Sequence, residues 1–160
     1  MIFKPPYKIE IPAEHAGKKT IFLAGSIEMG VAEDWQTRVA NELGESFVIF
    51  NPRRENWDSS WRQEFENPQF REQVEWELNG LEKADIVLMY FAPGSKSPIS
   101  LLEFGLYARS KKMIVCCPQG FWRKGNVDVT CNYYGVTQVD TIEELIATIK
   151  SPQIAQVTTD

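Results

Sequence analysis

Short apolar runs alternate with helix-like segments along the chain. Four runs of five or six residues, at 20–24, 46–50, 86–91 and 113–117, are apolar at almost every position, which is typical of strands buried on both faces of a sheet. Helical segments are expected at 32–43, 68–83 and 98–111, and a capping box at Thr141 and Glu144 opens another helix after a short fifth strand near 136–139. This alternation predicts an α/β fold with a doubly wound, five-stranded parallel sheet and helices on both faces.

The ends of the predicted strands indicate where a ligand would bind, because open parallel sheets bind ligands at the carboxyl ends of their strands. Those ends are followed by Gly25 and Ser26, the polar segment 51–67, the segment 92–97 and a loop expected at 118–129. Segment 51–67 is rich in tryptophan and too long for a simple connection, so we interpret it as a binding loop. Ser97 before Pro98 predicts a helix N-cap.

Length and composition favour one globular domain. The chain has 160 residues, of which 43% are hydrophobic and 12% aromatic, and a compact domain of this size needs no disulfide or metal to hold it together. We expect a single domain over 19–150, an irregular N-terminal arm over 1–18 and a frayed tail over 151–160. The three cysteines are expected to be buried, reduced thiols of a cytoplasmic protein.

Charge and residue types exclude several classes of function. The formal net charge is -5 and the basic residues are scattered, which disfavours a nucleic acid polymer or an anionic membrane as partner. No apolar stretch is long enough to span a bilayer. His15 is the only histidine, so catalytic triads and multi-histidine metal sites are disfavoured, and neither GxGxxG nor GxxxxGK[ST] occurs. We expect no metal and no cofactor.

Two glutamates are the strongest candidates for chemistry. Glu103 lies in the apolar sequence ISLLEFGLYA, in a helix that starts at the carboxyl end of the third strand, and Glu77 lies beside the buried stripe of the preceding helix. Either could simply be solvated. A pair of carboxylates is also the minimum equipment for cleaving a glycosidic bond, and their separation decides between a covalent intermediate and direct attack by water.

The strings TIFLAGS, ELNGLEKAD and LLEFGLYA, in this order and spacing, resemble the nucleoside 2-deoxyribosyltransferase family, in its transferase-like branch. The resemblance spans about 20–139. It implies a flavodoxin-like sheet and exchange or hydrolysis at the N-glycosidic bond of deoxyribonucleosides or their monophosphates. It also implies that Glu103 is the nucleophile that attacks C1′ and forms a deoxyribosyl-enzyme intermediate, with Glu77 as the acidic residue that holds the substrate or moves a proton.

The resemblance extends to substrate-binding positions. Gly25 and Ser26 form the turn after the first strand, Ser97 stands where monophosphate-hydrolysing relatives contact the phosphate, and Asn126 matches an asparagine that reaches into a neighbouring subunit, which implies a homodimer or higher homo-oligomer. Phe22 replaces a tyrosine that orients the nucleophile in the family. Either another hydroxyl, that of Tyr90 or Tyr107, takes its place, or the activity is slow or different.

The tryptophan-rich segment 51–67 and the residue Glu28 indicate what kind of substrate could bind. Trp57, Trp61 and Phe65 offer a face for a base, with Asp58 or Arg54 reading its edge, or else the tryptophans only pack the loop onto the sheet. Glu28 stands where phosphate-using relatives have an arginine and would repel a 5′-phosphate, whereas Ser97 favours one. Free nucleosides are the preferred substrate on this balance.

Three hypotheses follow. The first is an enzyme acting at the N-glycosidic bond of a deoxyribonucleoside, with a nucleoside 5′-monophosphate N-glycosidase as its variant. The second is a nucleotide-sensing module that keeps the fold without turnover. The third, a flavin-binding electron carrier, rests on the fold class alone.

Overall fold

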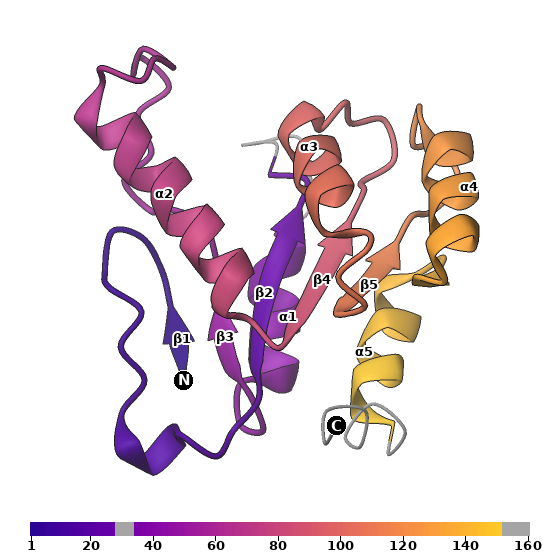
Figure 1. The fold of residues 1–160 in the computed structure, drawn as a ribbon, viewed down its shortest axis with the longest axis horizontal. Coiled ribbons are helices and arrows are strands. Elements are labelled where there is room, and N and C mark those ends of the chain that lie inside the picture. Colours follow the sequence, from indigo (N-terminus) through magenta and orange to yellow (C-terminus); the bar gives the residue numbers. More distant parts are fainter. Residues whose placement is uncertain (28–33, 152–160) are drawn as a thin grey trace.

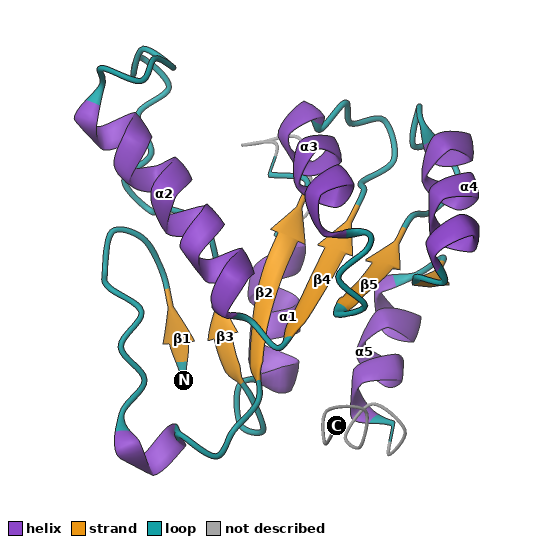
Figure 2. Ribbon diagram, viewed as in Figure 1, coloured by secondary structure: helices purple, strands orange, loops and turns teal. Residues whose placement is uncertain are grey.

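The fold is built on one parallel sheet (Figures 1 and 2). A computed structural model describes residues 1–27 and 34–151. Its strands are β1 (Ile2–Phe3), β2 (Thr20–Gly25), β3 (Val48–Phe50), β4 (Ile86–Tyr90), β5 (Met113–Cys116) and β6 (Thr137–Val139), in the spatial order β1-β3-β2-β4-β5-β6. Without β1 this is the flavodoxin-like order, so the expected fold class is confirmed.

The expected strand count was wrong, because part of the N-terminal arm joins the sheet. Ile2 lies opposite Ile49 and Phe3 opposite Phe50, so β1 adds a sixth strand beside β3. A two-residue strand leaves no period-2 pattern in a sequence, which is why the arm was expected to be irregular. Farther along the arm, the Tyr7 carbonyl accepts a hydrogen bond from Trp76 Nε1 at 2.8 Å.

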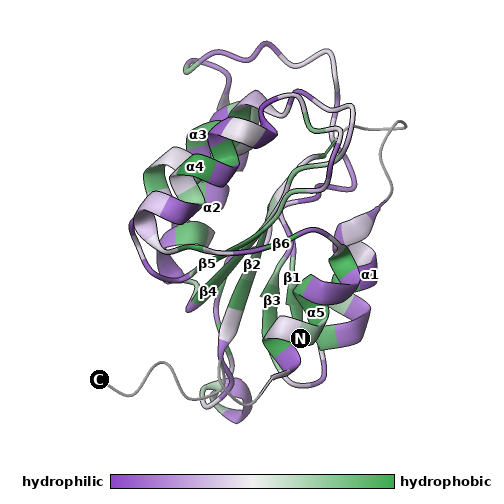
Figure 3. Ribbon diagram, turned by 90° about the vertical axis from the view of Figure 1, so that its right-hand side faces the viewer, coloured by the Kyte–Doolittle hydropathy of each residue, from purple (hydrophilic) through white to green (hydrophobic). Residues whose placement is uncertain are grey.

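Helices cover both faces of the sheet (Figure 3). Helices α2 (Pro68–Lys83), α3 (Pro98–Tyr107) and α4 (Lys124–Tyr134) lie on one face, and α1 (Trp35–Leu43) and α5 (Ile142–Lys150) lie on the other. A short 3₁₀ helix covers Ala13–His15. Side chains of successive strand residues point to opposite faces, so Phe22 joins the core under α2 while Ile21 and Leu23 join the core under α1 and α5.

Helix α4 corrects the expectation of a loop over 118–129. Its first half contains Gly125, Asn126 and Val127, which are weak helix formers. The helix forms because Val127 and Cys131 are buried against the sheet, and it ends at Gly135, whose φ of 67° is left-handed. The weak helix propensity of these residues therefore argued against α4, and packing against the sheet outweighs it.

The other helices agree with the sequence apart from their ends. Helix α1 ends at Leu43 as expected, and residues 32 and 33 of the predicted segment lie outside the described residues. Helix α3 stops at Tyr107, four residues before the expected end at 111. The predicted cap of α5 is present, since Thr141 accepts a hydrogen bond from the Glu144 backbone N–H at 3.1 Å.

The cysteines are free and buried, as expected. Burial raises the pKa of Cys116 and Cys117 to about 12 and that of Cys131 to about 11, so these thiols are unreactive near neutral pH. Among the described residues no helix has the length and apolar character to cross a membrane, and no group of three or more metal-ligating side chains occurs.

Candidate active site

A cleft of about 580 Å³ lies where the sequence places the ligand site, beyond the carboxyl ends of β2 and β3 and between α2 and α3. Its wall combines apolar side chains with two carboxyl groups, Glu77 and Glu103, and with three cationic residues, Arg53, Arg54 and Lys96. A mostly apolar cleft with a few converging charged groups is typical of small-molecule sites.

Glu103 is the most deeply buried acid of this cleft. It projects from α3, is 8% exposed, and neighbours the core residue Phe104. Burial, with a smaller contribution from the nearby charge of Glu77, raises the pKa of Glu103 to about 8. Within 1–27 and 34–151, no residue donates a hydrogen bond to its carboxyl group. This group is therefore mostly protonated at neutral pH and is left to interact with whatever enters the cleft.

Glu77 faces the same cleft from α2. It is half-buried, and its Oε1 accepts a hydrogen bond from Gln73 Nε2 at 2.8 Å. Burial raises the pKa of Glu77, although the hydrogen bond from Gln73 lowers it in part. Two helices thus bring together two carboxyl groups that share one environment, and each disfavours the charge of the other.

Three serine hydroxyls meet at the end of β2. Ser26 Oγ lies 2.6 Å from Ser97 Oγ and 3.0 Å from Ser95 Oγ, and the last two are 2.9 Å apart. The Ala92 backbone N–H donates to Ser26 Oγ, and Ser95 Oγ donates to the Ala92 carbonyl. Ser97 lines the cleft, while Ser26 lies buried behind it.

Ser97 is the N-cap residue of α3, as predicted, and Pro98 is the first helical residue, but the Ser97 side chain does not cap the helix. The residue precedes α3 in a left-handed conformation with φ of 41°, and its side chain makes no cap hydrogen bond. Its hydroxyl bonds to Ser26 and Ser95 instead. A non-glycine residue in this conformation is strained, and such strain gathers at functional sites.

Gly25 and Phe22, both expected to bind substrate, have different surroundings. Gly25 lines the cleft with φ of 131°, and a Cβ there would lie 2.2 Å from the Tyr90 carbonyl oxygen. Phe22 is fully buried in the core, with its ring 6.2 Å from that of Trp76, and is not among the cleft residues, so its assignment is corrected. A Cβ at Gly80 would lie 2.7 Å from the Phe22 ring, so the ring packs directly under α2.

Neither candidate for a substitute tyrosine hydroxyl is shown at Glu103. Tyr107 Oη donates to Glu82 at 2.6 Å, and Tyr90 packs its ring against Trp35 in the opposite core. The raised pKa of Glu103 is therefore explained by burial and by the charge of Glu77.

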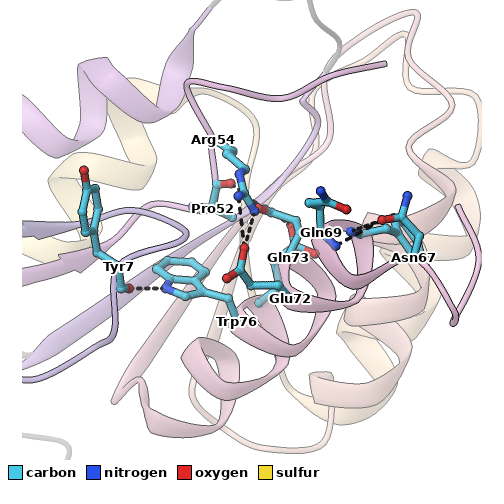
Figure 4. A network of polar contacts seen from close by, with 10 residues as sticks. Tyr7, Pro52, Arg54, Asn67, Gln69, Glu72, Gln73 and Trp76 are labelled. Carbon is cyan, nitrogen blue, oxygen red and sulfur yellow. Dashed lines mark hydrogen bonds and ion pairs between the residues drawn. The ribbon is translucent and has the colours of Figure 1, made fainter. Parts of the chain in front are cut away.

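The loop after β3 contributes one of its aromatic residues to the cleft. Trp57 lines it, with its ring 5.2 Å from that of Trp61. The Arg54 guanidinium lies 5.0 Å from the Trp61 ring and forms an ion pair with Glu72 at 3.1 Å (Figure 4). Trp57 and Arg54 are thus placed to contact a planar ligand.

Several expected residues lie elsewhere. Asp58 is exposed outside the cleft lining, and its carboxylate accepts the Ser60 backbone N–H at 2.8 Å. Phe65 is 72% exposed, and Asn126 is exposed on α4. The assignment of Asn126 to a neighbouring subunit's site stays a prediction. Glu28 lies outside the described residues.

A match to a known protein family covers most of the chain. Residues 18–121 match the family described as nucleoside 2-deoxyribosyltransferase like. The chain belongs to this family. The matched segment of this nucleoside 2-deoxyribosyltransferase-like chain contains β2 to β5, Glu77 and Glu103, and it excludes β1 and almost all of the N-terminal arm.

Solved structures share the fold. The crystal structure of a conserved protein from Enterococcus faecalis V583 has a TM-score of 0.59 at 11% identity, covering 83% of this chain and 98% of that one. The CMP N-glycosidase of Clostridium botulinum has a TM-score of 0.54 at 15% identity, covering 82% and 98%. No curated protein matches the chain.

Gln73 is a residue of the cleft that was not predicted from the sequence. It is 5% exposed, lines the cleft and contacts Glu77. The available signal was its position one helical turn before Glu77 and three residues before the buried Trp76. A glutamine inside a helix has no distinctive pattern, so the residue did not stand out.

Proposed function

We propose that the protein cleaves or transfers at the N-glycosidic bond of deoxyribonucleosides, with Glu103 as nucleophile. The observation that carries this proposal is the pair of carboxyl groups, one from α2 and one from α3, in a single cleft at the carboxyl ends of the strands. Family membership supports the reaction class.

In the proposed first step, a Glu103 carboxylate oxygen forms a bond to C1′ as the C1′–N bond breaks. The bonding electrons leave with the base, which takes up a proton from Glu77, the second carboxyl group of the cleft. In the second step a water or another base attacks C1′ and gives up a proton to Glu77, the bond to Glu103 breaks, and the Glu103 carboxylate is restored. Water gives hydrolysis, and an acceptor base gives exchange.

The nucleophile must be ionised to attack. Since burial and Glu77 hold the pKa of Glu103 near 8, the reactive form is a minority at neutral pH. Transfer of the proton from Glu103 to Glu77 as substrate binds would supply both the nucleophile and the acid that protonates the leaving base. The close electrostatic coupling of the two groups supports this division of roles.

A nucleoside 5′-monophosphate is the second candidate substrate. Arg53 and Lys96 line the cleft together with Ser97, and these are groups that bind phosphate oxygens. The solved relative from Clostridium botulinum is a CMP N-glycosidase. Assays with 2′-deoxycytidine and its 5′-monophosphate in parallel distinguish the two substrate classes.

We also propose a homo-oligomer in the cytoplasm. Helix α3 exposes Ile99, Leu102 and Leu106 by 58–60% each, and all three also border the cleft. A second copy packed on this face would bury the apolar side chains and cover the cleft mouth. The oligomeric state is measured by light scattering, and Leu102→Glu should yield monomers. The cytoplasmic assignment is supported by the three free cysteines.

Chromatography of purified protein incubated with deoxynucleosides, with and without a free acceptor base, tests the reaction. We expect free base, or a new nucleoside when an acceptor is present, and at least a thousandfold loss in Glu103→Gln. Thermal stabilisation by a nucleoside with no product in wild type would favour the sensing module instead. Equal product from wild type and Glu103→Gln would contradict the nucleophile assignment.

A further inference from the structure

Gln73 is a buried polar side chain with an incomplete set of partners. Its Nε2 donates to the Pro52 carbonyl at 2.9 Å and to Glu77 Oε1 at 2.8 Å. Its Oε1 is buried and has no hydrogen-bond partner among the described residues. Figure 4 shows the side chain extending from α2 toward Pro52.

The orientation of this amide is fixed by its neighbours. A proline carbonyl can only accept a hydrogen bond, so the amide nitrogen must face Pro52. Rotating the amide by half a turn would place its oxygen against that carbonyl and against a Glu77 oxygen. Gln73 lines the cleft, and its acceptor Oε1 is buried with neither lone pair used among the described residues, an arrangement that proteins avoid unless a ligand or water completes it.

The position of Gln73 indicates which part of a ligand it meets. One contact of its amide is to Pro52, at the start of the loop that brings Trp57 to the cleft, and the other is to Glu77, in the carboxyl pair. In the proposed reaction the sugar carbon C1′ lies at the carboxyl pair and the base extends toward the aromatic loop. The amide lies between these two places.

We propose that Gln73 is a specificity-determining residue whose Oε1 accepts a hydrogen bond from an amino or imide N–H of the nucleoside base. This inference rests on the proposed function for the identity of the ligand. Arg54 supports it, because its Nε–H is also buried and unpartnered within the described part of the chain and the residue lines the same cleft. The edge of a nucleoside base carries a hydrogen-bond donor next to an acceptor. The acceptor Oε1 of Gln73 and the donor Nε–H of Arg54 would complement these two groups.

Binding to Glu103→Gln protein tests the proposal without requiring turnover. Calorimetry compares 2′-deoxyadenosine with purine 2′-deoxyriboside, whose base carries no N–H. We expect the former to bind about tenfold more tightly, because a buried acceptor left unpaired penalises the analogue. Adding Gln73→Met, which keeps the side chain's length, should reduce the Kd ratio to within about twofold. The matched control Gln69→Met changes an exposed glutamine of the same helix and should keep the ratio.

The possible binding results separate a failure of the Gln73 role from a failure of the proposed substrate class. Equal Kd values for the two nucleosides in the parent protein, or an undiminished ratio in Gln73→Met, would overturn the role of Gln73 and leave the proposed reaction intact. Absence of binding by both nucleosides would overturn the inference together with the proposed substrate class. If Gln73→Met does not fold, as judged by its melting transition, the comparison of the two nucleosides in the parent protein still tests the inference, because it needs no change at position 73.

Discussion

Ionising Glu103 should cost the folded protein much of its stability. The pKa of this carboxyl group rises from an ordinary 4.5 to about 8 on folding, with burial as the main cause and the charge of Glu77 as the second. Between these two values the native state binds more protons than the unfolded state, so the free energy of unfolding falls as pH rises. The effect is complete above about pH 8 and absent below the unfolded pKa.

The size of the effect follows from the pKa difference. At about 1.4 kcal/mol per pH unit, the full difference corresponds to about 5 kcal/mol. Water entering the open cleft offsets part of the cost, so we expect wild type to lose about 2 to 5 kcal/mol between pH 5 and pH 9 relative to Glu103→Gln. Replacing the acid by an amide removes the titration and keeps the shape of the side chain.

Urea unfolding at pH 5, 7 and 9 measures this difference. The free energy of unfolding of wild type should decline across the series, and that of Glu103→Gln should decline much less. Glu75→Gln serves as the control, because Glu75 is an exposed residue of α2 and its loss should leave the wild-type decline unchanged. Parallel declines in wild type and Glu103→Gln would refute the reasoning.

Three further predictions concern the same elements. Because the proposed step needs one proton shared by Glu103 and Glu77, kcat/KM should fall as pH rises through about 8, whereas a kcat/KM that rises up to pH 8 would show that catalysis needs no proton on this pair. Gly25→Ala should destabilise the protein by about 3 kcal/mol or more in thermal unfolding, since its Cβ would lie 2.2 Å from the Tyr90 carbonyl oxygen, and a stability equal to wild type would contradict this contact. Lys112→Met should cost about 1 to 2 kcal/mol in urea unfolding, because Nζ bonds three carbonyls at the end of α2, at 2.7 to 3.2 Å, and an unchanged midpoint would show that water replaces them.

The central strands could be predicted because burial on both faces leaves a continuous apolar run. Ile86–Tyr90 has such a run, and the structure buries all five residues. Helix α4 and strand β1 could not be predicted in this way. Packing of Val127 against the sheet outweighs the weak propensity of α4, and β1 is shorter than any sequence period.

The site was predictable where charge contrasts with its surroundings. Glu103 stood out as an acid in an apolar helix, and the structure places it in the cleft with Glu77. The position of Ser97 before Pro98 correctly predicted the start of α3, but the hydrogen bond of its hydroxyl to Ser26, which is distant in the sequence, was not predicted. Contacts of that kind depend on how strands are ordered, which local patterns do not encode.

The two outer strands affect how the protein can associate with other chains. β1 has two residues and β6 has three, so each border of the sheet presents only a few backbone N–H and C=O groups to solvent. Long open borders invite strands of other molecules to add on, and very short ones discourage it. Assembly by sheet extension is therefore disfavoured, which leaves helical surfaces as the places where copies of this chain can meet and protects the apolar central strands from fibril-like growth.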